Sequence, residues 1–243
     1  MKLMVPSPVE IFAKHMSVSQ HRSNGRAVGS DGYPDLRWER AFWKAGMRHV
    51  AGVDEVGRGA MAGPLVAAAV VFPACEGWRL RKLKSALAGV RDSKLLTPER
   101  RVALAATIKE TAVAIGVGIV PVDELDAVGL GPANRIAMER AIFGIALEVD
   151  ALVIDACVLD LGCPQSGLID GDALSLSVAA ASIVAKVTRD RMMAVLAAED
   201  ARYGFERHKG YCSDYHKARL AEHGPSAHHR RCFAPVAAWN AAP

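Results

Sequence analysis

The chain has 243 residues, of which 51% are hydrophobic and 23% are charged, and its formal net charge is +4. This composition is typical of one large globular domain, or of one domain with extensions, and it excludes a chain that is disordered throughout. Pro64 and Pro73 interrupt the longest apolar stretch, which falls short of a membrane span, and no N-terminal apolar block predicts a secretory signal. We therefore expect no contact with a membrane.

Cysteine usage and local charge bear on the compartment and the partner. The five cysteines include no CxxC pair, and this odd count predicts free thiols in a reducing cytoplasm. Residues 201–232 hold seven lysines and arginines against three acidic residues, together with five of the eight histidines. Such a segment is typical of contact with a polyanion or of a solvated helical tail, and charge alone favours the tail.

Residues 1–46 are expected to form an N-terminal extension. Between residues 17 and 34 the sequence is polar and lacks apolar periodicity, which predicts a flexible segment. Trp38 and Phe42 then follow at helix-like spacing, so we expect a short helix that docks on the domain. The folded domain accordingly covers residues 47–243.

Apolar patterning inside the domain predicts strands first and then helices that alternate with strands. This order indicates an α/β fold with a mixed β-sheet flanked by helices. A glycine-rich turn at residues 57–63 joins the first two strands. The expected strands cover residues 50–56, 64–72, 112–120 and 151–155, and the expected helices cover residues 95–110, 134–147 and 176–199.

Acidic residues stand in or beside several of these apolar segments. Asp54 and Glu55 lie in the first strand. Asp155 closes the fourth strand, and Asp172 precedes the long helix. Taken alone, Asp172 is better explained by the N-terminus of a helix than by a functional site. Asp155 could equally open a turn, and the Asp54–Glu55 pair could equally form an ion pair with Arg58. Because buried carboxylates are costly unless paired or bound to metal, three such segments together indicate a shared site.

A carboxylate cluster without histidine or cysteine neighbours suits hard cations, so the predicted cofactor is Mg²⁺ or Mn²⁺. Two such ions about 4 Å apart can stabilise the attacking and leaving oxygens of a phosphodiester displacement. Adjacent strand residues point to opposite faces of a sheet, so Asp54 and Glu55 can share a site only where the strand ends or bulges. Gly57 and Gly59 favour such an end.

The glycine-rich turn also loosely resembles a dinucleotide-binding loop. Pro64 and a strand follow the turn, however, where that motif needs a helix, and the sequence contains no GxxxxGK[ST]. We therefore reject both nucleotide-cofactor interpretations. Glycines at Gly57, Gly59 and Gly63 predict instead a backbone that a ligand can approach closely.

Several blocks of sequence follow one another between about residues 50 and 236. They are DEVGRG at 54–59 with Gly63-Pro64, RDSKLLTP at 91–98, ALVID at 151–155, GD at 171–172, AAASIVAKVTRD at 179–190, YGF at 203–205 and HKGY at 208–211. In content and order these blocks resemble the type 2 ribonuclease H family, ribonuclease HII. So many matching blocks make the resemblance very specific, although it does not cover the N-terminal extension.

The resemblance implies a ribonuclease H-like fold with a helical, substrate-contacting appendage at about residues 201–235. It implies metal-dependent hydrolysis of the RNA strand of RNA–DNA hybrids. It also implies cleavage on the 5′ side of single ribonucleotides embedded in duplex DNA, leaving a 3′-hydroxyl and a 5′-phosphate. We expect the chain to act on these duplexes as a monomer. The catalytic and metal-ligating residues that the resemblance implies are Asp54, Glu55, Asp155 and Asp172.

The resemblance further implies which residues bind the substrate. The backbone of Gly57, Arg58 and Gly59 is expected to sense the 2′-hydroxyl that separates RNA from DNA. Tyr211 is expected to stack on the sugar at the RNA–DNA junction. Lys94 and the basic C-terminal segment are expected to contact phosphates. Simpler roles stay open: packing for Tyr211, a solvated charge for Lys94 and neutralisation of the acidic cluster for Arg58.

Other polar residues are expected to have structural roles. Lys186 and Asp190 are four residues apart on a helix, which favours a structural ion pair. Asn134 is expected to cap the helix at 134–147. The chain also departs from the family pattern where Cys212-Ser213 replaces Gly-Thr, Cys232 replaces Ser, Leu174 stands where Lys is common, and Ala156 stands where Gly is common.

Two alternative functions stay open at this point. One is another ribonuclease H-like nuclease or transposase that cuts DNA without needing a ribonucleotide. The other is a non-catalytic module that binds hybrids, which would require an acidic ligand to be missing.

Overall fold

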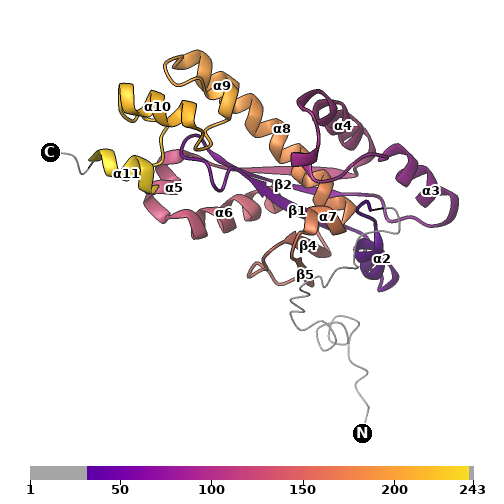
Figure 1. Cartoon of the computed structure of the whole chain (residues 1–243). Coiled ribbons are helices and arrows are strands. Elements are labelled where there is room, and N and C mark those ends of the chain that lie inside the picture. The colour runs from indigo at the N-terminus through magenta and orange to yellow at the C-terminus, as the bar shows by residue number, and fades with distance from the viewer. Residues whose placement is uncertain (1–31, 241–243) are drawn as a thin grey trace, which may run out of the picture.

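Strands and helices alternate along the chain around one β-sheet (Figure 1). This computed structural model describes residues 32–240. In chain order the elements are α2 (Arg37–Lys44), β1 (Val50–Val56), β2 (Leu65–Val71), α3 (Gly77–Ala86), η1 (Ser93–Leu95), α4 (Pro98–Thr111), β3 (Ala114–Val120), α5 (Val122–Val128), α6 (Leu130–Phe143), β4 (Ala151–Asp155), β5 (Gln165–Leu168), α7 (Gly171–Leu174), α8 (Leu176–Glu199), α9 (Phe205–His208), α10 (Asp214–His223) and α11 (Ala234–Asn240).

The sheet is mixed, and its strand order is β3-β2-β1-β4-β5. Strands β1, β2 and β3 pair antiparallel, whereas β4 runs parallel to both β1 and β5. The parallel pairing of β1 with β4 ends at Val53 opposite Ile154, but β1 stays paired with β2 as far as Val56. The sheet therefore splits between β1 and β4 immediately after this register position.

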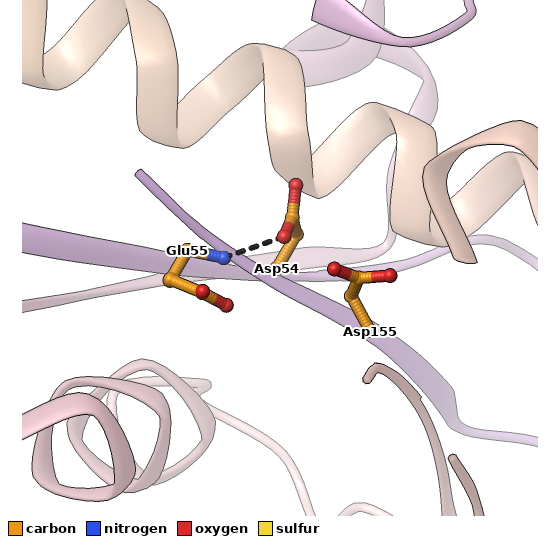
Figure 2. Close-up of side chains that lie close together, drawn as sticks. All are labelled: Asp54, Glu55 and Asp155. Carbon is orange, nitrogen blue, oxygen red and sulfur yellow. Dashed lines mark hydrogen bonds between the residues drawn. The ribbon is translucent and has the colours of Figure 1, made fainter. Parts of the chain in front are cut away.

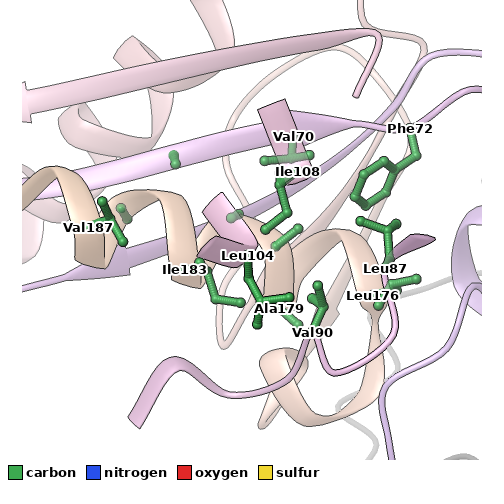
Figure 3. Packing of buried hydrophobic residues seen from close by; sticks show 14 of the residues in the cluster. Val70, Phe72, Leu87, Val90, Leu104, Ile108, Leu176, Ala179, Ile183 and Val187 are labelled. Carbon is green, nitrogen blue, oxygen red and sulfur yellow. The ribbon is translucent and has the colours of Figure 1, made fainter. Parts of the chain in front are cut away.

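Helices cover both faces of the sheet (Figure 1). On one face α8 lies with α3 and α4, and Figure 3 shows the apolar cluster there, which includes Val70, Leu104, Ile108 and Ile183. On the other face α5 and α6 pack on a second apolar cluster. Both sheet faces are thus buried, which explains why β2 is an uninterrupted apolar run that lacks polar alternation.

Small residues let the helices approach the sheet closely. A Cβ atom on Gly118 of β3 would lie 1.9 Å from the carbonyl oxygen of Ala137 on α6, and one on Gly52 of β1 would lie 2.3 Å from the backbone of Ser177 on α8. Any side chain at either position would force the layers apart. A chain with only 6% aromatic residues can therefore still fill its core.

All four predicted strands and all three predicted helices exist, although their ends differ by a few residues. The helix predicted at 95–110 begins at Pro98, because the Thr97 side chain caps it by accepting from Arg100 N–H. The prediction that Asn134 caps the next helix is wrong. That helix begins at Leu130 after Gly129, and Asn134 is buried inside it.

The structure also contains a fifth strand, β5, that the sequence analysis did not predict. It is four residues long and has the sequence QSGL, in which glycine and serine obscure any strand pattern. β5 is an edge strand and pairs with β4 as far as Asp155, which lies opposite Leu168. The strand therefore helps to fix the position of that carboxylate.

The predicted N-terminal helix is confirmed as α2, which packs beside β1 and β4. Glu39 on this helix is 1% exposed, and its Oε1 accepts hydrogen bonds from Ser175 Oγ (2.7 Å), Ser177 N–H (3.0 Å) and Ser177 Oγ (2.6 Å). Burial raises the pKa of this carboxyl. Most of the predicted flexible segment lies outside the described residues, and the domain boundary at residue 47 stays a prediction.

The C-terminal helices α9, α10 and α11 lie together beyond the end of α8 (Figure 1). The five cysteines are free thiols, as predicted. Between residues 32 and 240 no helix is both long enough and apolar enough to cross a membrane.

Candidate active site

Three of the four predicted acidic ligands converge where β1 and β4 separate. Oxygen atoms of Asp54, Glu55 and Asp155 all lie within 4.8 Å of one another (Figure 2). Asp54 is opposite Ala68 in the sheet, and Ala68 packs on the α8 face, whereas Glu55 is opposite Ala67 on the α6 face. The two side chains therefore leave opposite faces of β1 and meet through the open edge beside Asp155.

Neither a strand end nor a bulge is needed to bring these carboxylates together. β1 continues through Val56, but Glu55 N–H has no partner on β4 and donates instead to Asp54 Oδ1 at 2.8 Å (Figure 2). Asp155 Oδ1 accepts from Gly171 N–H at 2.7 Å. Backbone groups thus hold two of the carboxylates in place.

Burial and mutual repulsion make these carboxyl groups hard to ionise. Burial, followed by the charges of Asp155 and Glu55, raises the pKa of Asp54 well above its ordinary value. Burial and the Asp155 charge raise the pKa of Glu55, and burial also raises the pKa of Asp155. Because a divalent cation would relieve both costs, this all-oxygen donor set fits a hard cation such as Mg²⁺ or Mn²⁺.

Asp172 lies beside this cluster without belonging to the three-carboxylate group. It sits in the first turn of α7, and its Oδ2 lies 3.7 Å from Lys94 Nζ. Burial, followed by the neighbouring charge of Asp92, raises the pKa of Asp172 to about 6. The Lys94 side chain is 80% exposed and also lies 3.9 Å from Asp92. Lys94 is therefore an exposed cation that lies beside the acidic cluster.

The glycine-rich turn follows β1 directly and begins in a strained conformation. Gly57 has a φ of +92°, and a Cβ atom there would lie 2.2 Å from Arg189 Nε. Only glycine meets both conditions. Gly59 faces open space, since an added Cβ would meet no atom within 4 Å. The Arg58 guanidinium is exposed and reaches Glu55 at only 4.0 Å, so it partly neutralises the acidic cluster.

Two buried arginines hold this turn from behind. Arg230 donates to the carbonyl oxygens of Gly57 (2.6 Å), Gly63 (2.9 Å) and Pro64 (3.0 Å). Arg189 donates to those of Ala62 (2.9 Å), Pro64 (2.8 Å) and Lys209 (2.8 Å). Both arginines are 0% exposed. Neither role was predicted from the sequence. Every residue has a backbone carbonyl, so an arginine that donates to carbonyl oxygens leaves no recognisable pattern of paired residues.

These contacts fix the direction of the amide groups in the turn. Arg230 Nη1 donates to the carbonyls of Gly57 and, at 3.3 Å, Arg58. In a trans peptide the carbonyl and the next N–H point in opposite directions, so the N–H groups of Arg58 and Gly59 point away from Arg230. Within residues 32–240 these two N–H groups have no hydrogen-bond partner. They are available to a ligand.

Tyr211 lies next to the same turn. It forms an isolated β-bridge with Ala60, and the residue is 37% exposed. The guanidinium of Arg189 lies 5.5 Å from the centre of its ring, and Lys186 Nζ lies 6.0 Å away. The Tyr211 ring thus packs against two cationic side chains and still presents an exposed aromatic surface.

The expected ion pair of Lys186 and Asp190 is present at 2.6 Å.

Two of the residues that depart from the family pattern have a clear local role or cost in the structure. Ser213 is the N-cap of α10 and accepts from His216 N–H. Ala156, where the family commonly has glycine, has a φ of +53° immediately after Asp155. This left-handed conformation costs an alanine free energy that a glycine avoids.

The fold and the site together define a class of protein. The mixed sheet flanked by helices is a ribonuclease H-like fold, and carboxylates from two neighbouring strands converge where those strands separate. Such a centre is that of a metal-dependent phosphodiester hydrolase.

Comparisons with known proteins narrow this class to one family. The family described as "Ribonuclease HII" matches residues 51–236. The ribonuclease HII of Chloroflexus aurantiacus is 48% identical over 204 residues, which cover 84% of this chain and 94% of that protein. The chain belongs to the ribonuclease HII family and is a metal-dependent ribonuclease.

Solved structures agree with this assignment. The ribonuclease H2 of Pyrococcus horikoshii is 27% identical, with a TM-score of 0.66 over 79% of this chain and 97% of that one. The ribonuclease HII of Archaeoglobus fulgidus, solved in a complex with PCNA, is 28% identical, with a TM-score of 0.62 over 78% of this chain and 96% of that one.

Proposed function

We propose that this chain hydrolyses the RNA strand of RNA–DNA hybrids and cuts on the 5′ side of single ribonucleotides embedded in duplex DNA. The products carry a 3′-hydroxyl and a 5′-phosphate. The convergence of the Asp54, Glu55 and Asp155 carboxylates within 4.8 Å carries this proposal. The activity serves DNA replication and repair, because it removes ribonucleotides from DNA.

Two Mg²⁺ or Mn²⁺ ions are the proposed cofactors, held by Asp54, Glu55, Asp155 and Asp172. When bound, such ions supply the Lewis acidity that activates a water and stabilises the leaving oxygen of a phosphodiester hydrolysis. The hydrogen bonds that Asp54 and Asp155 accept from backbone N–H groups orient the carboxylates beforehand. Asp172, which lies 3.7 Å from Lys94 Nζ beside the three-carboxylate group, is the proposed fourth ligand.

The neighbouring residues select the substrate. The backbone of Gly57, Arg58 and Gly59 is proposed to sense the ribose 2′-hydroxyl, the group that distinguishes RNA from DNA. The outward N–H groups of Arg58 and Gly59 support this role. The exposed part of the Tyr211 ring stacks on the sugar at the RNA–DNA junction. Lys94 contacts a phosphate beside the pocket, which gives binding a dependence on salt.

The chain is proposed to act as a monomer. The five free cysteines fit a reducing cytoplasm.

The test compares three duplexes of equal length: one with a single embedded ribonucleotide, one uniform RNA–DNA hybrid and one of DNA alone. With Mg²⁺ or Mn²⁺ we expect cleavage of the first two, on the 5′ side of the ribonucleotide in the first, and none with EDTA. Cleavage of the all-DNA duplex would identify a nuclease that does not need a ribonucleotide. A chain that binds hybrids but cuts none of the duplexes would be a binding module.

A further inference from the structure

Two buried histidines behind Tyr211 take no part in the site described so far. His216 on α10 is 0% exposed and His229 is 1% exposed. Their Nε2 atoms lie 3.0 Å apart. Burying two imidazoles costs free energy unless each ring nitrogen finds a partner. All four nitrogens have one, because His216 Nδ1 lies 2.9 Å from the Tyr211 carbonyl oxygen and His229 Nδ1 lies 3.0 Å from Ser226 N.

The two ends of this chain of hydrogen bonds fix where the protons lie. The N–H of Ser226 can only donate, so His229 Nδ1 accepts and the neutral His229 ring carries its proton on Nε2. Ser226 Oγ lies 2.9 Å from the same Nδ1 and can also donate to it, which agrees with this tautomer. That proton is donated to His216 Nε2, which leaves the His216 proton on Nδ1. Nδ1–H then donates to the Tyr211 carbonyl, which can only accept. One arrangement of protons therefore satisfies every group.

The same segments are bonded to the glycine-rich turn. Ala60 forms a β-bridge with Tyr211, and Ala62 forms one with His229. Met61 N–H donates to the Gly210 carbonyl at 2.8 Å. The turn thus holds both the Tyr211 segment and the His229 segment, and the His216 ring links these two segments by contacting the Tyr211 carbonyl oxygen and His229 Nε2. The turn, the Tyr211 segment and the His229 segment are therefore each connected to the other two.

We propose that His216 and His229 are positioning residues that fix Tyr211 relative to the glycine-rich turn and so set the preference for a ribose followed by a deoxyribose. The inference rests on the proposed roles of the turn and of Tyr211. A stacking ring and a 2′-hydroxyl sensor recognise neighbouring sugars of one strand, so the distance between them decides which junction fits. Neither histidine touches the substrate, and both act through the Tyr211 backbone.

Two substitutions of His216 separate positioning from packing. His216→Leu fills most of the space but cannot donate to the Tyr211 carbonyl. His216→Asn is smaller, and its amide N–H lies one bond from Cγ, as Nδ1 does, so it can replace that donor. If the ring only fills space, the leucine variant is the milder change. If the ring positions Tyr211, the asparagine variant is the milder change for substrate preference, whatever its melting temperature.

The readout is binding without cleavage. Dissociation constants are measured in EDTA by fluorescence anisotropy for a duplex with one RNA–DNA junction and for a uniform hybrid. We expect His216→Leu to reduce the preference for the junction by about fivefold to tenfold, the worth of one buried hydrogen bond. We expect His216→Asn to keep the preference within about twofold of the wild type. A leucine variant that keeps the full preference, or an asparagine variant that loses as much as leucine, overturns the proposal.

Two further measurements keep the inference independent of folding and of cleavage. In a Tyr211→Ala background, His216→Leu should reduce the preference no further, because both changes act through one ring. An additional loss contradicts this. In the unsubstituted chain, long-range ¹H–¹⁵N spectra should place the protons on His216 Nδ1 and His229 Nε2, and the opposite tautomers overturn the proposal. Failure of the proposed cleavage appears separately, as intact duplexes in Mg²⁺ or Mn²⁺.

Discussion

Asp54 and Glu55 are neighbours on one strand, and their side chains leave opposite faces of the sheet, yet their carboxylates belong to one cluster. The cluster forms because β4 is no longer paired with β1 beyond Val53, so that no strand separates the two carboxylates there. A sheet that stayed paired at this point would hold the two carboxylates apart on opposite faces. The geometry of the site therefore follows from where the parallel pairing stops.

The arginine behind the glycine-rich turn gives a first prediction. Arg230→Lys leaves a single nitrogen that cannot reach the carbonyls of Gly57, Gly63 and Pro64 together, so buried carbonyls lose their donors. We expect the free energy of unfolding to fall by about 2–4 kcal/mol and the preference for a ribonucleotide to weaken. Urea unfolding measures the first effect, and cleavage rates on the three duplexes measure the second.

The control for this change is Arg231→Lys, because Arg231 is exposed and is the next residue along the chain. We expect its free energy of unfolding to stay within about 0.5 kcal/mol of that of the unsubstituted chain. Equal free energies of unfolding for the two variants would mean that the hydrogen bonds from Arg230 to the turn do not stabilise the fold.

A second prediction concerns the left-handed residue after Asp155. Ala156 has a φ of +53°, where glycine carries no steric cost. We expect Ala156→Gly to raise the free energy of unfolding by about 0.5–1 kcal/mol, since relief of strain exceeds the extra entropy of the unfolded chain. The matched control is Ala127→Gly on the exposed side of α5, which should lower it by about 1 kcal/mol. A loss of stability at both positions would contradict the account.

The histidine pair predicts how stability depends on pH. Burial is the main reason that the pKa values of His216 and His229 are lowered from 6.5 to about 4. At His216 the hydrogen bond to the Tyr211 carbonyl opposes this lowering, and at His229 the neighbouring His216 ring adds to it. The unfolded chain thus binds more protons than the folded chain between these values. The stability contributed by the neutral rings is complete above pH 6.5 and is lost as the pH falls towards 4.

Two measurements check this dependence. Ring proton shifts followed by NMR should show no midpoint near pH 6.5 for His216 or His229. The raised pKa values of the buried carboxyl groups act in the opposite direction over the same range, so the urea-unfolding readout is the difference between two proteins. From pH 6.5 down to pH 4.5 the unsubstituted chain should lose more free energy of unfolding than His216→Gln does, because the variant lacks one group that gains a proton on unfolding. A normal midpoint for both rings would mean that they are solvated rather than buried.

Much of the fold was predictable from sequence because its signals are local. The apolar runs of β1, β2, β3 and β4 and the periodicity of α8 indicate their own structure. β5 was missed because its four residues include glycine and serine, and it is a strand only through its pairing with β4. Asn134 was misplaced because the helix begins at Leu130, in a glycine- and proline-containing stretch with weak helical signals.

The acidic residues of the site were predictable as residue types at the ends of apolar segments, and the structure brings Asp54, Glu55 and Asp155 together. How Asp54 and Glu55 meet was not predictable, since the open edge depends on the register between β1 and β4. The supporting residues were equally hidden. The hydrogen bonds of Arg189 go to backbone carbonyls, and the imidazole of His216 is hydrogen-bonded to one carbonyl and one other imidazole. None of these contacts leaves a pattern in the sequence.

The most direct test of the central claim is the cleavage rate of Asp54→Asn on a DNA duplex with one embedded ribonucleotide, measured beside its binding affinity. Asparagine keeps the size of the side chain but removes a charge from the pocket that holds the cation. We expect the rate in Mg²⁺ or Mn²⁺ to fall by at least about 10²–10³-fold, with the dissociation constant within about threefold, and Asp123→Asn on exposed α5 to cleave normally. Full activity of Asp54→Asn, or cleavage by the unsubstituted chain in EDTA, would contradict a metal-holding carboxylate pocket.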